Sequence, residues 1–158
     1  MSNLENEYSN IFQDIFIQKN KASIEDVSEH RLFRHLNHNH ELAYYLSFIK
    51  ENYIRNALSK LRLGSHNLKV ERGRWERPKM EFLDRICDEC NVVEDEYHVI
   101  FKCTRFNNLR KKYIQNSLVQ NPSMYEFIKL INSKDHGKVR KLGIFFHNAF
   151  KEYDNSYM

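Results

Sequence analysis

The feature that most constrains this chain is a group of three cysteines and one histidine between positions 87 and 103. They follow the spacing Cys87-x2-Cys90-x7-His98-x4-Cys103, and the chain has no other cysteine. An odd number of cysteines fits a disulfide framework poorly. Thiolates and imidazole are the ligands that Zn²⁺ prefers, and four of them close a tetrahedral structural site. The spacing therefore predicts a structural zinc site, with buried thiols beside an ordinary surface histidine as the alternative.

The same spacing argues against a catalytic zinc. Three thiolates and one imidazole leave no open position for water. The base-deaminase signature needs a glutamate two residues after the histidine and a later Pro-Cys-x-x-Cys, but position 100 is Ile and the cysteine pair comes first. Residues five apart diverge by about 140° on an ideal helix. We therefore expect His98 on a short helix that Glu94 or Asp95 initiates, with Cys103 at or beyond its end.

The composition favours a mainly α-helical fold. The 158 residues are 41% hydrophobic and include only 4 Gly and 2 Pro, too few for a multi-turn all-β fold. We expect a helical domain with a short β or loop segment and an embedded Cys-Cys-His-Cys module. No stretch approaches the roughly 18 apolar residues of a membrane span, and the N-terminus lacks a signal-peptide pattern. The chain is therefore expected to be intracellular, in the nucleus or cytoplasm, with no membrane partner.

Apolar periodicity and breaker residues divide the chain into two parts. Residues 1–40 are expected to form N-terminal helices of unassigned role, and residues 41–158 a helical domain with the zinc module at 85–103. Gly64 stands where the cap of a long helix belongs, and the alternation over 66–70 predicts a short strand. The predicted helices span about 4–16, 23–35, 41–63, 106–118, 124–131 and 138–153.

Basic residues flank an acidic Cys/His stretch. The net charge is only +4, but the positive side chains gather on both sides of the module, so phosphate contacts should come from the flanks. Trp75 lies among arginines, where it can either stack on an unpaired base or anchor the core under the metal site. The candidate nucleic-acid-binding residues are Arg62, His66, Lys69, Arg72, Arg74, Trp75, Arg77, Arg110, Lys111 and Lys112.

Several motifs occur in a fixed order along this part of the chain. LSKLRLGSHNLKVERGRW (Leu58 to Trp75) contains the pattern R-x-G-x-H-x-L-x-x-E-x-G-R, and EDEYHVIFKC ends at Cys103. Phe106 and the pair Leu109-Arg110 complete a C-x-x-[FY]-x-x-L-R pattern. In this order and spacing the chain resembles the C-terminal zinc-binding tail of non-LTR (LINE-type) retrotransposon reverse transcriptases.

The resemblance covers roughly residues 41–153. It implies that Cys87, Cys90, His98 and Cys103 are the metal ligands, and that the conserved-type polar positions are Arg62, His66, Glu71 and Arg74. It also implies a part in holding template RNA or target DNA, as a truncated or repurposed fragment of such an element.

The catalytic motifs of these elements are missing from the sequence. There is no Asp-Asp pair for a polymerase, and neither proline precedes an aspartate as in the associated endonuclease. We therefore expect no enzyme, but a zinc-stapled module that binds RNA or DNA. The alternative is a zinc-stabilised protein-interaction module, which would use the apolar stripe at residues 4–16 to bind a partner or a second copy.

Overall fold

Helix α10 (His136–Ser156) is the element around which the other helices pack. The computed structural model describes Leu32, Leu36 and residues 42–156, so the predicted helices at 4–16 and 23–35 lie outside it apart from Leu32. The described part is mainly helical, as the composition predicted, and none of its helices is long and apolar enough to cross a bilayer. The elements before α10 are α3 (Tyr45–Phe48), α4 (Asn52–Leu63), α5 (Lys69–Arg72), η1 (Phe82–Asp84), α6 (Glu96–Phe101), η2 (Thr104–Phe106), α7 (Asn107–Tyr113), α8 (Asn116–Gln120) and α9 (Met124–Ile131).

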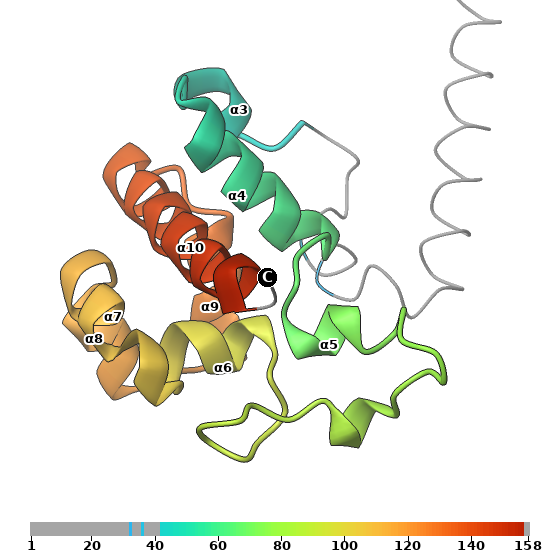
Figure 1. Cartoon of the computed structure of the whole chain (residues 1–158). Helices are drawn as coiled ribbons and strands as arrows, with labels where there is room; N and C mark the ends of the chain where they lie inside the picture. The colour runs from blue at the N-terminus through green and yellow to red at the C-terminus, as the bar shows by residue number, and fades with distance from the viewer. Residues whose placement is uncertain (1–31, 33–35, 37–41, 157–158) are drawn as a thin grey trace, which may run out of the picture.

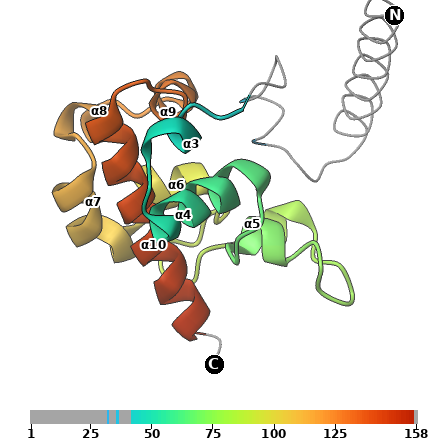
Figure 2. The same cartoon turned by 90° about the horizontal axis from the view of Figure 1, so that it is seen from above.

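Helices α4 and α10 run side by side in the same direction, with α7 on the other side of α10 (Figure 1, Figure 2). Glu51 at the start of α4 pairs with Arg140 in the first half of α10 at 2.6 Å. Further along both helices, Tyr53 of α4 contacts His147 of α10, with ring centroids 4.9 Å apart. The core surrounds α10, whose Phe145 and Tyr153 rings contact Phe106 of η2 while Phe150 stacks on His66.

Gly143 sets the distance between α4 and α10. A Cβ atom at this position would lie 2.4 Å from Cγ2 of Ile54 and 3.1 Å from Cγ of Leu58. Both neighbours are fully buried branched side chains that have little room to move. The two backbones therefore approach more closely than any larger residue at position 143 allows.

Sequence patterns located several helix ends correctly. The predicted helix at 124–131 is α9, and the one at 138–153 lies within α10. Ser123 caps α9 by accepting a hydrogen bond from the backbone N–H of Glu126. Gly64 ends α4 in the left-handed region with φ 64°, as expected for a C-terminal glycine.

The single long helix predicted at 41–63 is wrong. The chain leaves helical geometry between Ile49 and Glu51, which are both extended, so that α3 and α4 are separate. Ile49 is buried at this break, and the ring of Phe48 stacks on His136 at a centroid distance of 3.7 Å. The break therefore lets α3 fold over the start of α10, a tertiary contact that the helical periodicity does not reveal.

Two further predictions are corrected. The helix expected at 106–118 is divided, because Ile114 and Gln115 are extended between α7 and α8. The strand expected at 66–70 is an irregular stretch that enters α5. Alternate burial is present there, since His66 and Leu68 are buried and Asn67 is exposed, but the described residues offer it no partner strand.

Replacing Gly143 with alanine should destabilise the protein by about 1–3 kcal/mol, because the added methyl overpacks the α4–α10 contact. Thermal and urea unfolding would measure the loss. Gly137→Ala is the matched control in the same helix, since its Cβ would meet only Asp135 Oδ1 at 3.3 Å. Equal stability of the two variants would contradict the close approach described here.

Candidate metal centre

Four ligand-type side chains meet where the loop after η1 joins α6. One donor atom from each of Cys87, Cys90, His98 and Cys103 lies within 4.8 Å of the others. The Sγ atoms of Cys87 and Cys103 are 3.9 Å apart, far longer than a disulfide bond. Sulfurs about 2.3 Å from one tetrahedral ion would be separated by about 3.8 Å. The four residues can therefore hold a metal ion, as their spacing predicted.

His98 has the surroundings of a ligand rather than of a surface side chain. It is 5% exposed, and its Nε2 is buried with no hydrogen-bond partner in the described part of the chain. A buried nitrogen of this kind costs free energy unless something accepts its lone pair or proton. The alternative of an ordinary surface histidine beside buried thiols is therefore wrong.

The first two ligands are held by a tight loop. Backbone N–H groups close it twice, from Cys87 to the carbonyl of Val92 at 2.8 Å and from Asn91 to the carbonyl of Cys87 at 2.9 Å. An isolated antiparallel bridge joins Ile86 to Val93 at its base. Asn91 has φ 54°, a left-handed conformation that asparagine tolerates better than most residues. The loop thus aims both cysteines at one point.

The other two ligands are placed by the two ends of α6. Asp95 is the N-cap, and its Oδ1 accepts a hydrogen bond from the backbone N–H of His98 at 2.7 Å. The helix ends after Phe101, and the N–H of Cys103 donates to the carbonyl of His98 at 2.8 Å. His98 on a short helix, Asp95 as initiator and Cys103 beyond its end are all confirmed.

Burial sets the protonation of the cluster without metal. It raises the pKa of the Cys103 thiol to about 12 and also raises the pKa of Cys87. A hydrogen bond from the Thr104 backbone lowers the pKa of the more exposed Cys90, and burial lowers the pKa of His98. A metal ligand must be a thiolate or a neutral imidazole. Metal binding here must therefore release protons from the buried thiols.

Arg110 of α7 holds the chain on the far side of the cluster. Its guanidinium donates to the carbonyls of Ile100 at 2.6 Å, Val99 at 3.2 Å and Cys103 at 2.7 Å. A fourth hydrogen bond reaches Asn107 Oδ1 at 2.6 Å. The Val99 and Ile100 carbonyls lie in the last turn of α6, where carbonyls lack helical partners, and a buried cation at that end also suits the helix dipole. Arg110 therefore fixes the position of Cys103 relative to α6.

The segment before the cluster docks on the same helix through buried polar pairs. The Nε2 of His66 lies 3.2 Å from Oε1 of Glu96, and its ring stacks on Phe150. The backbone N–H of Lys69 donates to Oε1 of Glu94 at 2.9 Å. Both carboxylates are buried, Glu94 just before α6 and Glu96 as its first residue. Residues 66–69 are thus held against the start of α6, the helix that carries His98.

Arg85, two residues before the first cysteine, forms a second internal anchor. It donates to the carbonyl of Val70 at 2.6 Å and to that of Met80 at 2.8 Å. A Cβ at position 73 would lie 2.8 Å from its Cγ, so Gly73 leaves the space that this side chain fills. The glycine of the E-x-G-R pattern is thereby explained by packing.

These contacts correct part of the predicted nucleic-acid surface. Arg62 is 8% exposed and donates to Asn132 Oδ1 at 3.0 Å, and Arg74 pairs with Glu71 at 2.6 Å with its side chain 7% exposed. Buried donors that are bound to protein acceptors cannot also bind phosphate without breaking the fold. The candidates removed from the surface for this reason are Arg62, His66, Arg74 and Arg110.

The remaining candidates lie on the outside to different degrees. Lys69 and Arg72 are partly covered and pair with Asp88 and Glu76. Trp75 is 70% exposed, so its interpretation as a core anchor is wrong. The exposed candidates are Trp75, Arg77, Lys111 and Lys112.

Sequence patterns missed the residues that tie the cysteine loop to the chain after Cys103. Thr104 Oγ1 lies 3.5 Å from the Sγ of Cys90. Arg105 Nε donates to Glu89 Oε1 at 2.9 Å. Glu89 and Arg105 are too far apart in the sequence to belong to one helical or strand pattern. The one available signal was that Glu89 and Thr104 are each adjacent to a cysteine of the cluster.

Comparisons with protein-family models, with curated proteins and with solved structures each gave no significant match.

Replacing Arg110 with alanine should cost about 3 kcal/mol or more of folding free energy, because buried carbonyls lose a charged donor. Chemical denaturation of the metal-loaded protein would measure it. Lys111→Ala is the control, since it removes a neighbouring exposed cation of the same helix. If both variants unfold at the same denaturant concentration, Arg110 does not hold the end of α6.

Proposed function

We propose that this protein is a non-catalytic nucleic-acid-binding module, stapled by zinc and related in plan to the C-terminal tail of non-LTR retrotransposon reverse transcriptases. The resemblance of its ordered motifs supports this relation. Its pattern residues also have coherent structural roles here, because His66, Glu71, Gly73 and Arg110 form internal contacts around one Cys/His cluster. Because these pattern residues are used inside the fold, we assign nucleic-acid binding to exposed side chains outside them.

Zinc is the metal that suits this cluster best. Three sulfurs and one imidazole nitrogen within 4.8 Å of one another match a closed tetrahedral site. Soft thiolate ligands disfavour magnesium and calcium, which prefer oxygen. Because four protein ligands leave no coordination position for water, this donor set supports a structural rather than a catalytic role for the ion.

The observation that carries the nucleic-acid proposal is the exposed Trp75 in the loop between α5 and the cluster. Tryptophan is 70% exposed there, and Arg77 and Lys79 beside it are also exposed. An exposed tryptophan beside exposed cations offers both an apolar face and positive charge to one partner. Aromatic rings stack on unpaired bases, while nearby cations contact the backbone phosphates.

A protein-binding function is the second candidate, favoured by other exposed apolar side chains in the same region. Leu83 is 75% and Phe82 43% exposed, and neither lies between basic residues. Such side chains suit a protein partner. The stripe at residues 4–16, on which this alternative first rested, lies outside the described residues.

Zinc affinity should rise with pH, because the raised pKa values of Cys87 and Cys103 mean that both must lose a proton on binding. We expect about tenfold tighter binding per pH unit for each such thiol below its pKa. Competition with a chromophoric chelator between about pH 6 and 8 would measure it, with Cys103→Ser as the comparison. A pH-independent affinity would refute ligation by these thiols.

Trp75→Ala should weaken binding of a fluorescent single-stranded RNA by about tenfold, since one base–aromatic stack is worth about 1–3 kcal/mol. Trp75→Phe should keep part of the affinity. Fluorescence anisotropy of the zinc-loaded protein would measure both.

Tyr125→Ala is the control for this experiment, because Tyr125 is 72% exposed on α9 and lies near a lysine, Lys129. Leu83→Ser separates the two candidate functions. If Leu83→Ser and Trp75→Ala reduce RNA binding equally, or if neither does, the stacking role is wrong.

A further inference from the structure

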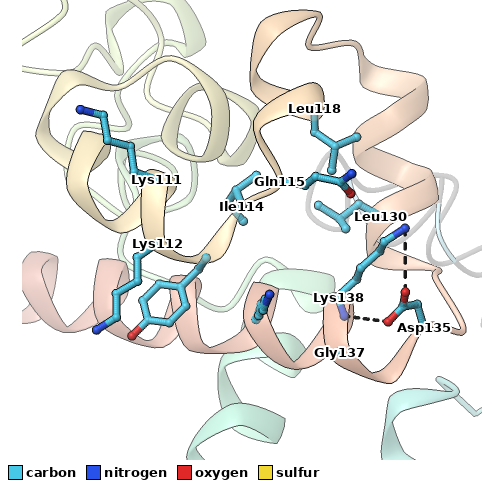
Figure 3. Close-up of a pocket in the computed structure, with 11 residues that line it drawn as sticks. Lys111, Lys112, Ile114, Gln115, Leu118, Leu130, Asp135, Gly137 and Lys138 are labelled. Carbon is cyan, nitrogen blue, oxygen red and sulfur yellow. Dashed lines mark hydrogen bonds and ion pairs between the residues drawn. The ribbon is translucent and has the colours of Figure 1, made fainter.

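A groove lies between the end of α7, the start of α8 and the first turns of α10, with a volume of about 410 Å³ (Figure 3). Its apolar floor consists of Ile114, Leu118 and Leu130. The break between α7 and α8 at Ile114 and Gln115 opens it, because a continuous helix would carry these side chains elsewhere. The groove is thus built by the fold and not by a single loop.

Four exposed lysines line this groove from both sides. Figure 3 shows Lys111 and Lys112 on α7 and Lys138 on α10. Lys141, one turn further along α10, also lines the groove. Asp135 is the one acidic residue of the lining. Its Oδ1 accepts the backbone N–H of Lys138 at 3.0 Å, and its Oδ2 lies 3.8 Å from Nζ of the same residue.

The lining therefore carries a surplus of positive charge. Among the residues that the structure describes, Lys111, Lys112 and Lys141 have no carboxylate within ion-pair distance. A concave surface with like charges on two walls concentrates its field on what enters it. The ligand should therefore be an anion.

The shape of the depression indicates an extended anion. A second hollow of about 450 Å³ shares Lys111 and Ile114 with the groove and continues along α7 towards Asn116 of α8. A single phosphate or mononucleotide would fill only one of the two. A chain with regularly spaced charges would follow both.

The apolar floor distinguishes single strands from duplexes. An unpaired base can lie on Ile114 and Leu118 beside the ring of Tyr113, which also lines the groove. A duplex hides its base faces in its own stack and would leave this floor uncovered.

We propose that this lysine groove binds a segment of single-stranded nucleic acid, with phosphates at the lysines and a base on the apolar floor. The proposal rests on the proposed function and locates its phosphate contacts, adding Lys138 and Lys141 to the lysines of α7. Arg110 links the groove to the Cys/His cluster. It lies on α7 beside Lys111 and Lys112, and it donates hydrogen bonds to the carbonyls of Ile100 and Cys103.

The test compares two double variants of the zinc-loaded protein. Lys138→Ala/Lys141→Ala removes the α10 side of the groove, whereas Lys60→Ala/Lys151→Ala removes two exposed lysines from a separate pocket between α4 and the end of α10. Both variants have the same net charge. Anisotropy with a fluorescent oligouridine, and with a blunt RNA duplex of equal length, is measured between about 50 and 200 mM salt.

The groove variant should bind the single strand roughly tenfold more weakly at the lowest salt, and its log–log salt slope should be flatter by about 1.4, since each phosphate neutralised on a single strand contributes about 0.7. The control variant should stay within about twofold of the unaltered protein. If the unaltered protein binds RNA and both variants lose affinity equally, the groove is not the binding site, but the proposed function still stands. A duplex that binds as well as the single strand, with equal loss in the groove variant, would overturn the single-strand assignment. If the unaltered protein binds no RNA at any salt, the proposed function fails as well.

Discussion

The crowding of three sulfurs and one imidazole within 4.8 Å is the constraint on which the rest of this structure depends. Two of the thiols are buried, and like groups at this distance disfavour the thiolate unless a cation lies between them. The ligands come from a loop and from the two ends of a short helix. An ion held by these four residues would fasten segments that, as a helix of six residues and a turn, would be marginal alone.

Several basic side chains near the cluster are buried and have a structural role, which distinguishes them from the exposed basic side chains. Arg85 donates to the carbonyl of Val70, Arg110 donates to the carbonyls of Val99 and Ile100 at the end of α6, and Arg62 donates to Asn132 Oδ1. Such side chains are fully used inside the protein, although their letters in the sequence match those of a phosphate-binding patch. In the described part of the chain, the residues proposed to bind nucleic acid that remain exposed include Trp75, Arg77 and the lysines of α7 and α10.

The features that could be predicted from the sequence are local. The ligand spacing, the N-cap at Asp95 and the glycine cap at Gly64 are each determined by a few neighbouring residues, and all three occur in the structure. The breaks at Ile49 and Ile114 could not be predicted, because no glycine or proline marks them and tertiary packing decides them. The same limit applied to Arg85 and Arg110, since most of their acceptors are backbone carbonyls, whose positions no residue type marks. It applied again to the lysine groove, whose two walls are distant in the sequence.

The parallel contact between α4 and α10 has a consequence for synthesis. The ribosome adds about 5–20 residues per second, so α4 emerges several seconds before the helix that covers its apolar face. All four cluster residues are made within that interval, between the two helices. An ion bound by this cluster would therefore be available to the nascent chain before the core closes. Without the proposed ion, the cluster segment between the two helices would stay unfastened, and chains in that state are substrates for chaperones and proteases.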